Sequence, residues 1–105
     1  MNRQLTMLIV EDMEVERISF AEIFKDEYQI LEAENGRQAV AILQSATDID
    51  LLLLDIMMPE MDGFEVLKAM NANHTIEDIP VIMISSDDSN AVIRKSYELG
   101  ASDYV

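Results

Sequence analysis

One apolar run restricts what this chain can fold into. Residues 51–54 are four consecutive leucines, and they lead directly into Asp55. A continuous apolar run of this length is typical of a strand buried on both faces, as in a parallel sheet. Asp55 then lies where the buried strand ends and a loop begins, which is an unusual place for a carboxylate. The run alone leaves two interpretations open: Asp55 caps a turn, or it belongs to a functional site.

Strand-like and helix-like segments alternate along the rest of the chain. Five segments are predicted as strands, at 7–10, 28–33, 51–55, 81–84 and 103–105. Four segments are predicted as helices, at 14–26, 37–45, from 64 to about 70, and from about 89 to 99. Because the helical connections are long enough for crossovers, this alternation favours an α/β fold, with a parallel sheet covered by helices on both faces.

Local signals predict how some of these elements are built. The first helix carries a wide apolar stripe that we expect to face the core, formed by Ile18, Phe20, Ala21, Ile23 and Phe24. Asp88 or Ser89 can cap the fourth helix, and Gly100 is well placed to end it. Residues 71–78 are expected to form a polar loop.

The composition sets limits on function. The 105 residues are half hydrophobic, which suits one globular domain spanning 1–105. The absence of cysteine excludes disulfides, thiolate metal sites and a cysteine nucleophile. Twenty-one acidic against seven basic side chains give a net charge of −14, which disfavours binding to nucleic acid or to an anionic membrane. The first residues contain no long apolar stretch, so we expect no signal peptide, no membrane span and a cytoplasmic protein.

Polar side chains directly follow or end three of the predicted strands. Glu11 and Asp12 follow the first strand, Asp55 ends the third, and Ser85 follows the fourth. In an open parallel sheet the carboxyl ends of the strands lie along one edge, and functional groups gather where the strand order reverses. If the first and third strands are neighbours, three carboxylates converge there and need protons or a cation. Oxygen ligands without histidine or cysteine suit a hard ion, and Mg²⁺ fits this set best.

The same residue types bear on the reaction class. A carboxylate beside Mg²⁺ can act as a nucleophile toward phosphorus. No Gly-rich phosphate loop is present, which argues against a P-loop nucleotide enzyme. His74 is the one histidine and lies in a polar stretch, so we interpret it as a surface residue and find no Ser–His–Asp set.

The order and spacing of these motifs resemble the receiver domain of two-component response regulators. The resemblance is carried by Leu8-Ile-Val-Glu-Asp12, Leu54-Asp-Ile-Met-Met-Pro-Glu-Met-Asp-Gly63, Pro80-Val-Ile-Met-Ile-Ser85 and Gly100-Ala-Ser-Asp-Tyr-Val105. These segments span essentially the whole chain. The resemblance implies a doubly wound, flavodoxin-like sheet of five parallel strands in the order 2-1-3-4-5.

The resemblance also implies roles for the residues at the acidic edge. Asp55 would accept a phosphoryl group from a phosphohistidine of a sensor histidine kinase or a histidine phosphotransfer domain. Glu11 and Asp12 would help to bind Mg²⁺, with Asp12 and Asp55 favoured as direct ligands and Met57 contributing its backbone carbonyl. Ser85 would hydrogen-bond the phosphoryl oxygens during the transfer.

A conformational switch and a partner surface are implied in the same way. Ser85 would draw its loop inward on phosphorylation, and Tyr104 would rotate inward with it. Taken without the resemblance, Tyr104 is an ordinary strand aromatic and Ser85 a loop or cap hydroxyl. Ile93 and Tyr97 lie one turn apart on the fourth helix, which the family uses for output, so we predict a partner contact there. The alternative for Ile93 is a scattered surface apolar residue.

The chain departs from the family pattern after Val105. The family has a lysine and a proline at the end of the fifth strand, followed by a fifth helix, and none of these follows Val105 here. We therefore expect a receiver domain that is truncated within its fifth strand, in which Mg²⁺ binds while phosphorylation or its readout is impaired. The missing helix would expose one side of residues 51–54 and 81–84, which favours a homodimer or a domain-swapped dimer.

These residues allow three candidate functions. The first is a signalling switch, not an enzyme in the usual sense, that takes part in its own phosphorylation at Asp55. The second is a Mg²⁺-dependent phosphatase, which typically needs a second acid two residues after its nucleophile, where this chain has Met57. The third is a receiver-fold interaction module with impaired response to phosphate. We favour the first and keep the third as the alternative.

Overall fold

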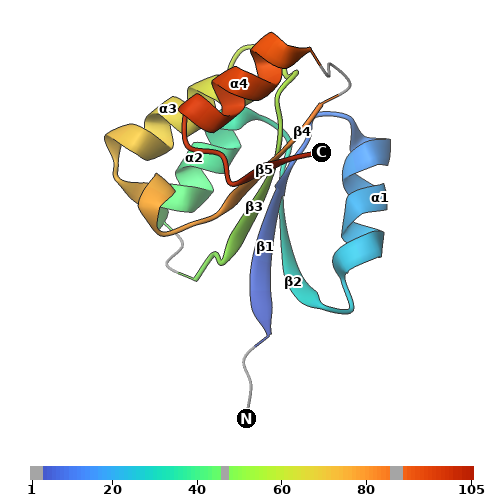
Figure 1. Ribbon diagram of the computed structural model, residues 1–105. Coiled ribbons are helices and arrows are strands. Elements are labelled where there is room, and N and C mark those ends of the chain that lie inside the picture. The colour runs from blue at the N-terminus through green and yellow to red at the C-terminus, as the bar shows by residue number, and fades with distance from the viewer. Residues whose placement is uncertain (1–3, 46–47, 86–88) are drawn as a thin grey trace.

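Five parallel strands form one sheet in a computed structural model that describes residues 4–45, 48–85 and 89–105 (Figure 1). The strands are β1 (Leu5–Val10), β2 (Tyr28–Ala33), β3 (Leu51–Asp55), β4 (Val81–Ile84) and β5 (Asp103–Tyr104). Their order across the sheet is β2-β1-β3-β4-β5. The predicted α/β fold, its parallel pairing and its strand order are therefore confirmed, and β5 is a short strand.

The helices cover the two faces of the sheet unequally. They are α1 (Glu14–Phe24), α2 (Gly36–Ser45), α3 (Gly63–Ala72) and α4 (Asn90–Glu98), with a 3₁₀ turn, η1 (Thr75–Glu77), between α3 and β4. Figure 1 shows α1 alone on one face and α2, α3 and α4 on the other. The described part of the chain contains no fifth helix.

The leucine run forms the buried centre of the sheet, as predicted. Leu52 and Leu54 are fully buried in the core between the sheet and α2, α3 and α4. Leu53 is buried in a second, smaller core on the α1 side, and Leu51 packs at its border. Because side chains alternate between the faces of a strand, burial of both sets explains the unbroken apolar run at residues 51–54.

The uncovered face is smaller than the sequence led us to expect. On the α1 side of the sheet, Leu53 and Ile84 are buried, and they pack near Phe20. Leu51 and Ile82 are half-buried. One helix with aromatic side chains therefore shields the middle strands near the acidic edge, and the partial exposure lies further from that edge.

The apolar stripe predicted for α1 is partly wrong. Three of its members face the core, namely Phe20, Ala21 and Phe24. Ile18 and Ile23 are instead 49% and 64% exposed. The reason is that Arg17 occupies a buried position on the helix, so the inward face runs through residues 17, 20, 21 and 24 and turns Ile18 and Ile23 outward.

The ends of α4 follow their sequence signals. The Ser89 hydroxyl accepts a hydrogen bond from the Val92 N–H and begins the helix, while Asp88, the other candidate cap, lies outside the described residues. Gly100 follows the helix with φ of 104°, a conformation that favours glycine. The polar stretch 71–78 is not entirely loop, because it contains η1.

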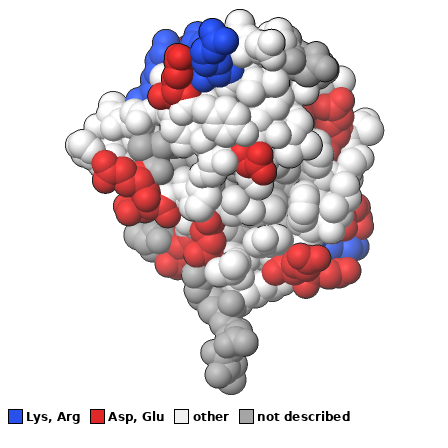
Figure 2. Space-filling view, viewed as in Figure 1, with Lys and Arg blue, Asp and Glu red and all other residues white. Residues whose placement is uncertain are grey.

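Charge is distributed unevenly over the surface seen in Figure 2. Acidic side chains are spread around this face, whereas most of the visible basic side chains gather over α4. No helix in the described ranges is long and apolar enough to cross a bilayer.

Candidate functional site

The pairing of β1 with β3 brings two of the predicted acidic residues side by side. Val10 is paired with Leu54, so Glu11 and Asp55 each lie one residue further along neighbouring strands. Glu11 continues the alternation of Ile9, and Asp55 that of Leu53, both of which lie on the α1 side of the sheet. The two carboxylates therefore meet at the carboxyl edge of the sheet, on the face that α1 covers.

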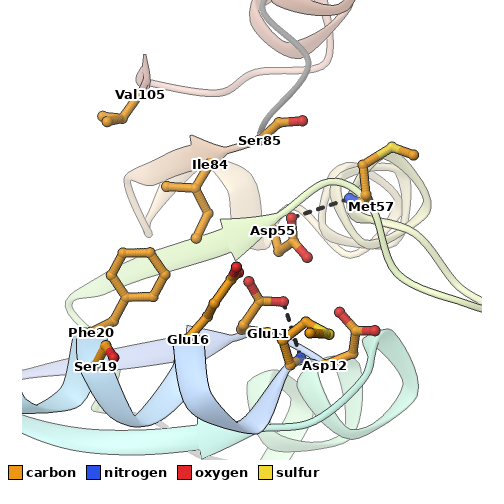
Figure 3. Close-up of a pocket in the computed structure, with 11 residues that line it drawn as sticks. Glu11, Asp12, Glu16, Ser19, Phe20, Asp55, Met57, Ile84, Ser85 and Val105 are labelled. Atoms are coloured by element: carbon orange, nitrogen blue, oxygen red, sulfur yellow. Dashed lines mark hydrogen bonds between the residues drawn. The ribbon is translucent and has the colours of Figure 1, made fainter.

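Asp12 completes a cluster of three carboxylates. Oxygen atoms of Glu11, Asp12 and Asp55 lie within 4.8 Å of one another. Figure 3 shows their carboxylates facing a common space. The convergence expected from the sequence is confirmed, and an all-oxygen set of this size can hold a hard divalent cation such as Mg²⁺.

Burial is the main reason why the pKa of Glu11 is raised. Its side chain is 2% exposed, and this burial, together with hydrogen bonds to Asp55, Glu16 and Asp12, raises the pKa of Glu11 to about 9. The Met13 N–H donates a hydrogen bond to Glu11 Oε2 at 3.3 Å. Without a cation, therefore, the protonated form of Glu11 is favoured, and its O–H can donate a hydrogen bond to the Asp55 carboxylate.

The pKa of Asp55 is also raised, although opposing influences act on it. Burial is the largest of them and raises its pKa, as do the charges of Asp12 and Glu16. Hydrogen bonds from Glu11 and from the Met57 N–H, the latter at 3.2 Å from Asp55 Oδ1, act in the opposite direction. One Asp55 oxygen is thus fixed by the backbone.

A buried arginine that the sequence analysis did not single out anchors the loop after β1. Arg17 Nη1 donates to the backbone carbonyl of Glu11 at 2.9 Å. Its Nε donates to Glu32 Oε1 at 3.1 Å, and its Nη2 lies 3.7 Å from Glu34 Oε1. The guanidinium therefore ties the start of the acidic loop to the end of β2 and to α1.

The three carboxylates open into a cavity of about 640 Å³ between β1, β3, β4 and α1. Its lining residues are Glu11, Asp12, Met13, Glu16, Ser19, Phe20, Asp55, Met57, Ile84, Ser85 and Val105. Glu16, in the first turn of α1, is the fourth acidic residue of this lining. In Figure 3 its carboxylate points toward the acidic cluster.

The predicted switch residues lie on two neighbouring strands. Ser85 follows β4 directly, is half-buried, and lies across Asp55 from Glu11 in Figure 3. Tyr104 in β5 is half-buried and packs against the core on the α4 side of the sheet. Ser85 is thus brought to the site, and the rotation of Tyr104 stays a prediction.

The remaining predicted residues lie away from the cavity. Ile93 is half-buried on α4, and Tyr97 is 47% exposed, with its hydroxyl 3.4 Å from Asp103 Oδ1. A partner contact at these two residues stays a prediction. His74 is exposed, with Nδ1 3.9 Å from Glu77 Oε1, which agrees with its interpretation as a surface residue.

Comparison with known proteins identifies the family to which this chain belongs. The family model described as the response regulator receiver domain matches residues 7–105. A two-component response regulator of rice, Oryza sativa, is 30% identical over 100 residues, which cover 94% of this chain and 76% of that protein. The chain belongs to the receiver domain family of two-component response regulators.

Two further relatives show the contexts in which similar sequences occur. A probable cyclic di-GMP phosphodiesterase of Vibrio cholerae is 39% identical over 102 residues, which are 97% of this chain and 23% of that protein. The solved structure of a Vibrio cholerae chemotaxis protein superimposes with a TM-score of 0.90 at 27% identity, covering 98% of this chain and 86% of that one. Receiver domains are signalling modules. The resemblance of this sequence to the receiver domain family is confirmed.

Proposed function

We propose that this receiver domain is a phosphorylated switch that accepts a phosphoryl group on Asp55. The observation that carries the proposal is the position of this carboxylate. It ends the buried central strand β3, is 8% exposed, and has one oxygen fixed by the Met57 N–H at the mouth of a cavity. A rigidly aimed carboxylate that opens on a cavity large enough for a phosphoryl group is suited to nucleophilic attack.

The proposed reaction is a transfer from phosphohistidine. A carboxylate oxygen of Asp55 attacks phosphorus, a P–O bond forms, and the P–N bond breaks with its electron pair leaving on the imidazole nitrogen, which takes up a proton. Asp55 becomes an acyl phosphate. Mg²⁺ held by Asp12 and Asp55, with Glu11 beside them and the Met57 backbone carbonyl as a further ligand, would offset the negative charge of the phosphoryl group.

The ionisation of Glu11 supports the proposal that a cation binds beside Asp55. In the absence of a cation, burial and its acidic neighbours favour the protonated form of Glu11. Binding of a divalent cation would release that proton, since carboxylate ligands bind in their ionised form. The acidic cluster is therefore suited to bind a cation. A solvent-exposed carboxylate that only caps a turn would not need one.

The conformational response would run through Ser85 and Tyr104. The Ser85 side chain, at the end of β4, lines the same cavity as Asp55 and can donate to a phosphoryl oxygen. Its movement toward Asp55 would free space for Tyr104 on the neighbouring strand. The alternative is a receiver-fold interaction module in which phosphorylation or its readout is impaired.

Labelling with acetyl phosphate separates these possibilities. We expect Mg²⁺-dependent phosphorylation of the chain that is lost with excess EDTA and in Asp55→Asn, and amide NMR shifts at Ser85 and Tyr104 on phosphorylation. Labelling without shifts at these two residues supports the interaction module. No labelling at saturating Mg²⁺ contradicts the proposed phosphoacceptor function.

The proposal also defines partners. The donor would be a sensor histidine kinase or a histidine phosphotransfer domain in the cytoplasm, and Ile93 with Tyr97 would contact the output partner. A second copy could pair through the half-buried Leu51 and Ile82 on the α1 side. Sedimentation across a hundredfold range of concentration tests this, and a monomer throughout contradicts the homodimer.

A further inference from the structure

The cavity contains a fourth carboxylate that the proposed ligand set does not use. Glu16 lies in the first turn of α1, and its side chain lines the cavity together with Glu11 and Asp55. Figure 3 shows it entering from the helix, on the side opposite Ser85. Glu14, in the same turn, is exposed as Glu16 is, but only Glu16 is among the lining residues. Two acids of one helical turn thus differ in their access to the site.

Two interactions connect Glu16 to the acidic cluster. The Glu16 carboxyl group is one of the groups that raise the pKa of Glu11, and its charge also raises the pKa of Asp55. The reason lies in the fold, because Glu11 and Asp55 point to the face of the sheet that α1 covers, where the first turn of the helix carries Glu16. Glu16 therefore belongs to the electrostatic environment of the site.

We propose that Glu16 is a positioning residue of the cavity that strengthens divalent-cation binding and opposes the approach of a phosphoryl dianion. Its negative charge, at the wall of the cavity, attracts a cation at the neighbouring carboxylates. The same charge repels an anionic phosphodonor in the cavity. The two effects have opposite signs, which a purely structural role in α1 would not produce. The second effect rests on the proposed phosphorylation of Asp55, whereas the first does not.

The test compares Glu16→Gln with Glu14→Gln, which removes the same charge from the same turn outside the cavity. Mg²⁺ binding is measured by titration of amide resonances, which also report whether each variant is folded. We expect Glu16→Gln to raise the Mg²⁺ dissociation constant on the order of three- to tenfold, and Glu14→Gln by less than about twofold. Equal dissociation constants for the two variants would overturn the proposal.

The second measurement is the initial rate of labelling by acetyl phosphate at two Mg²⁺ concentrations. At saturating Mg²⁺ we expect Glu16→Gln to be labelled faster than the wild-type chain, and at limiting Mg²⁺ more slowly. A uniform decrease at both concentrations overturns the repulsive role of Glu16. If the wild-type chain binds Mg²⁺ but is never labelled, the proposed function of Asp55 fails, and the Mg²⁺ titration alone still decides whether Glu16 supports the cation.

Discussion

Removing the charge of Asp55 should stabilise the protein when no divalent cation is present. Glu11, Asp12 and Asp55 have oxygen atoms within 4.8 Å of one another, and Glu11 and Asp55 are almost completely buried. Two unit charges 4.8 Å apart repel each other by about 3.5 kcal/mol at an effective dielectric constant of ~20. The proton shared within the cluster and solvent entering from the cavity reduce this repulsion. We therefore expect Asp55→Asn to raise the free energy of unfolding by about 1–3 kcal/mol at pH 8 in EDTA.

The effect has a defined dependence on pH. The pKa of Glu11 is raised from 4.5 to about 9 in the folded protein, so the folded state holds a proton that the unfolded chain releases. This contribution to stability is fully present below about pH 4.5 and is lost as the pH rises toward 9. The wild-type protein in EDTA should therefore lose stability between pH 6 and pH 8. Asp55→Asn should lose less, because one of the groups that raises the pKa of Glu11 no longer carries a charge.

Urea unfolding followed by circular dichroism measures both effects. Saturating Mg²⁺ should stabilise the wild-type chain at pH 8 and leave Asp55→Asn nearly unchanged, since a ligand stabilises only a state that binds it. Glu27→Gln, an exposed acid away from the cavity, serves as the control for net charge. If Asp55→Asn is no more stable than this control at pH 8 in EDTA, or responds to Mg²⁺ as the wild type does, the electrostatic reasoning about the site is wrong.

Three further substitutions test the framework around the site. Arg17→Gln removes the buried guanidinium that binds the Glu11 carbonyl, and should lower the free energy of unfolding by about 2–3 kcal/mol in urea titrations. Gly63→Ala places a Cβ 2.5 Å from the backbone oxygen of Asp55, which cannot move aside easily, so a loss of about 2–3 kcal/mol is expected by the same measurement. Glu60 has φ of 67°, and Glu60→Gly should therefore raise the melting temperature, with a gain of about 0.5–1 kcal/mol. A loss of stability in Glu60→Gly, or unchanged stability in either of the other two, contradicts the packing described here.

The strands and the acidic edge could be predicted because their signals are local. The leucine run, the short apolar runs and the polar residues that follow them specify which segments are buried and where each strand ends. Parallel pairing then requires the carboxyl ends to share an edge, which predicts that Glu11, Asp12 and Asp55 converge if β1 and β3 are neighbours. The resemblance added the order of the strands.

The α1 side of the site could not be predicted by the same reasoning. An apolar stripe does not reveal that Arg17 takes a buried position, because its partners on β2 come from a different part of the sequence. That position rotates the helix, exposes Ile18 and Ile23, and directs Glu16 into the cavity. One signal was available: Glu11 and Asp55 share the strand face of Ile9 and Leu53, so the helix over that face had to supply the cavity wall.

The central claim is that Asp55 receives a phosphoryl group from phosphohistidine. The most direct test incubates the chain with a histidine phosphotransfer domain that carries a radioactive phosphoryl group, and follows the label in both proteins with and without Mg²⁺. We predict that label leaves the donor only with Mg²⁺, appears on this chain, and is mapped by mass spectrometry to Asp55. Label that stays on the donor, or that reaches Asp55→Asn as readily as the wild-type chain, would contradict the claim.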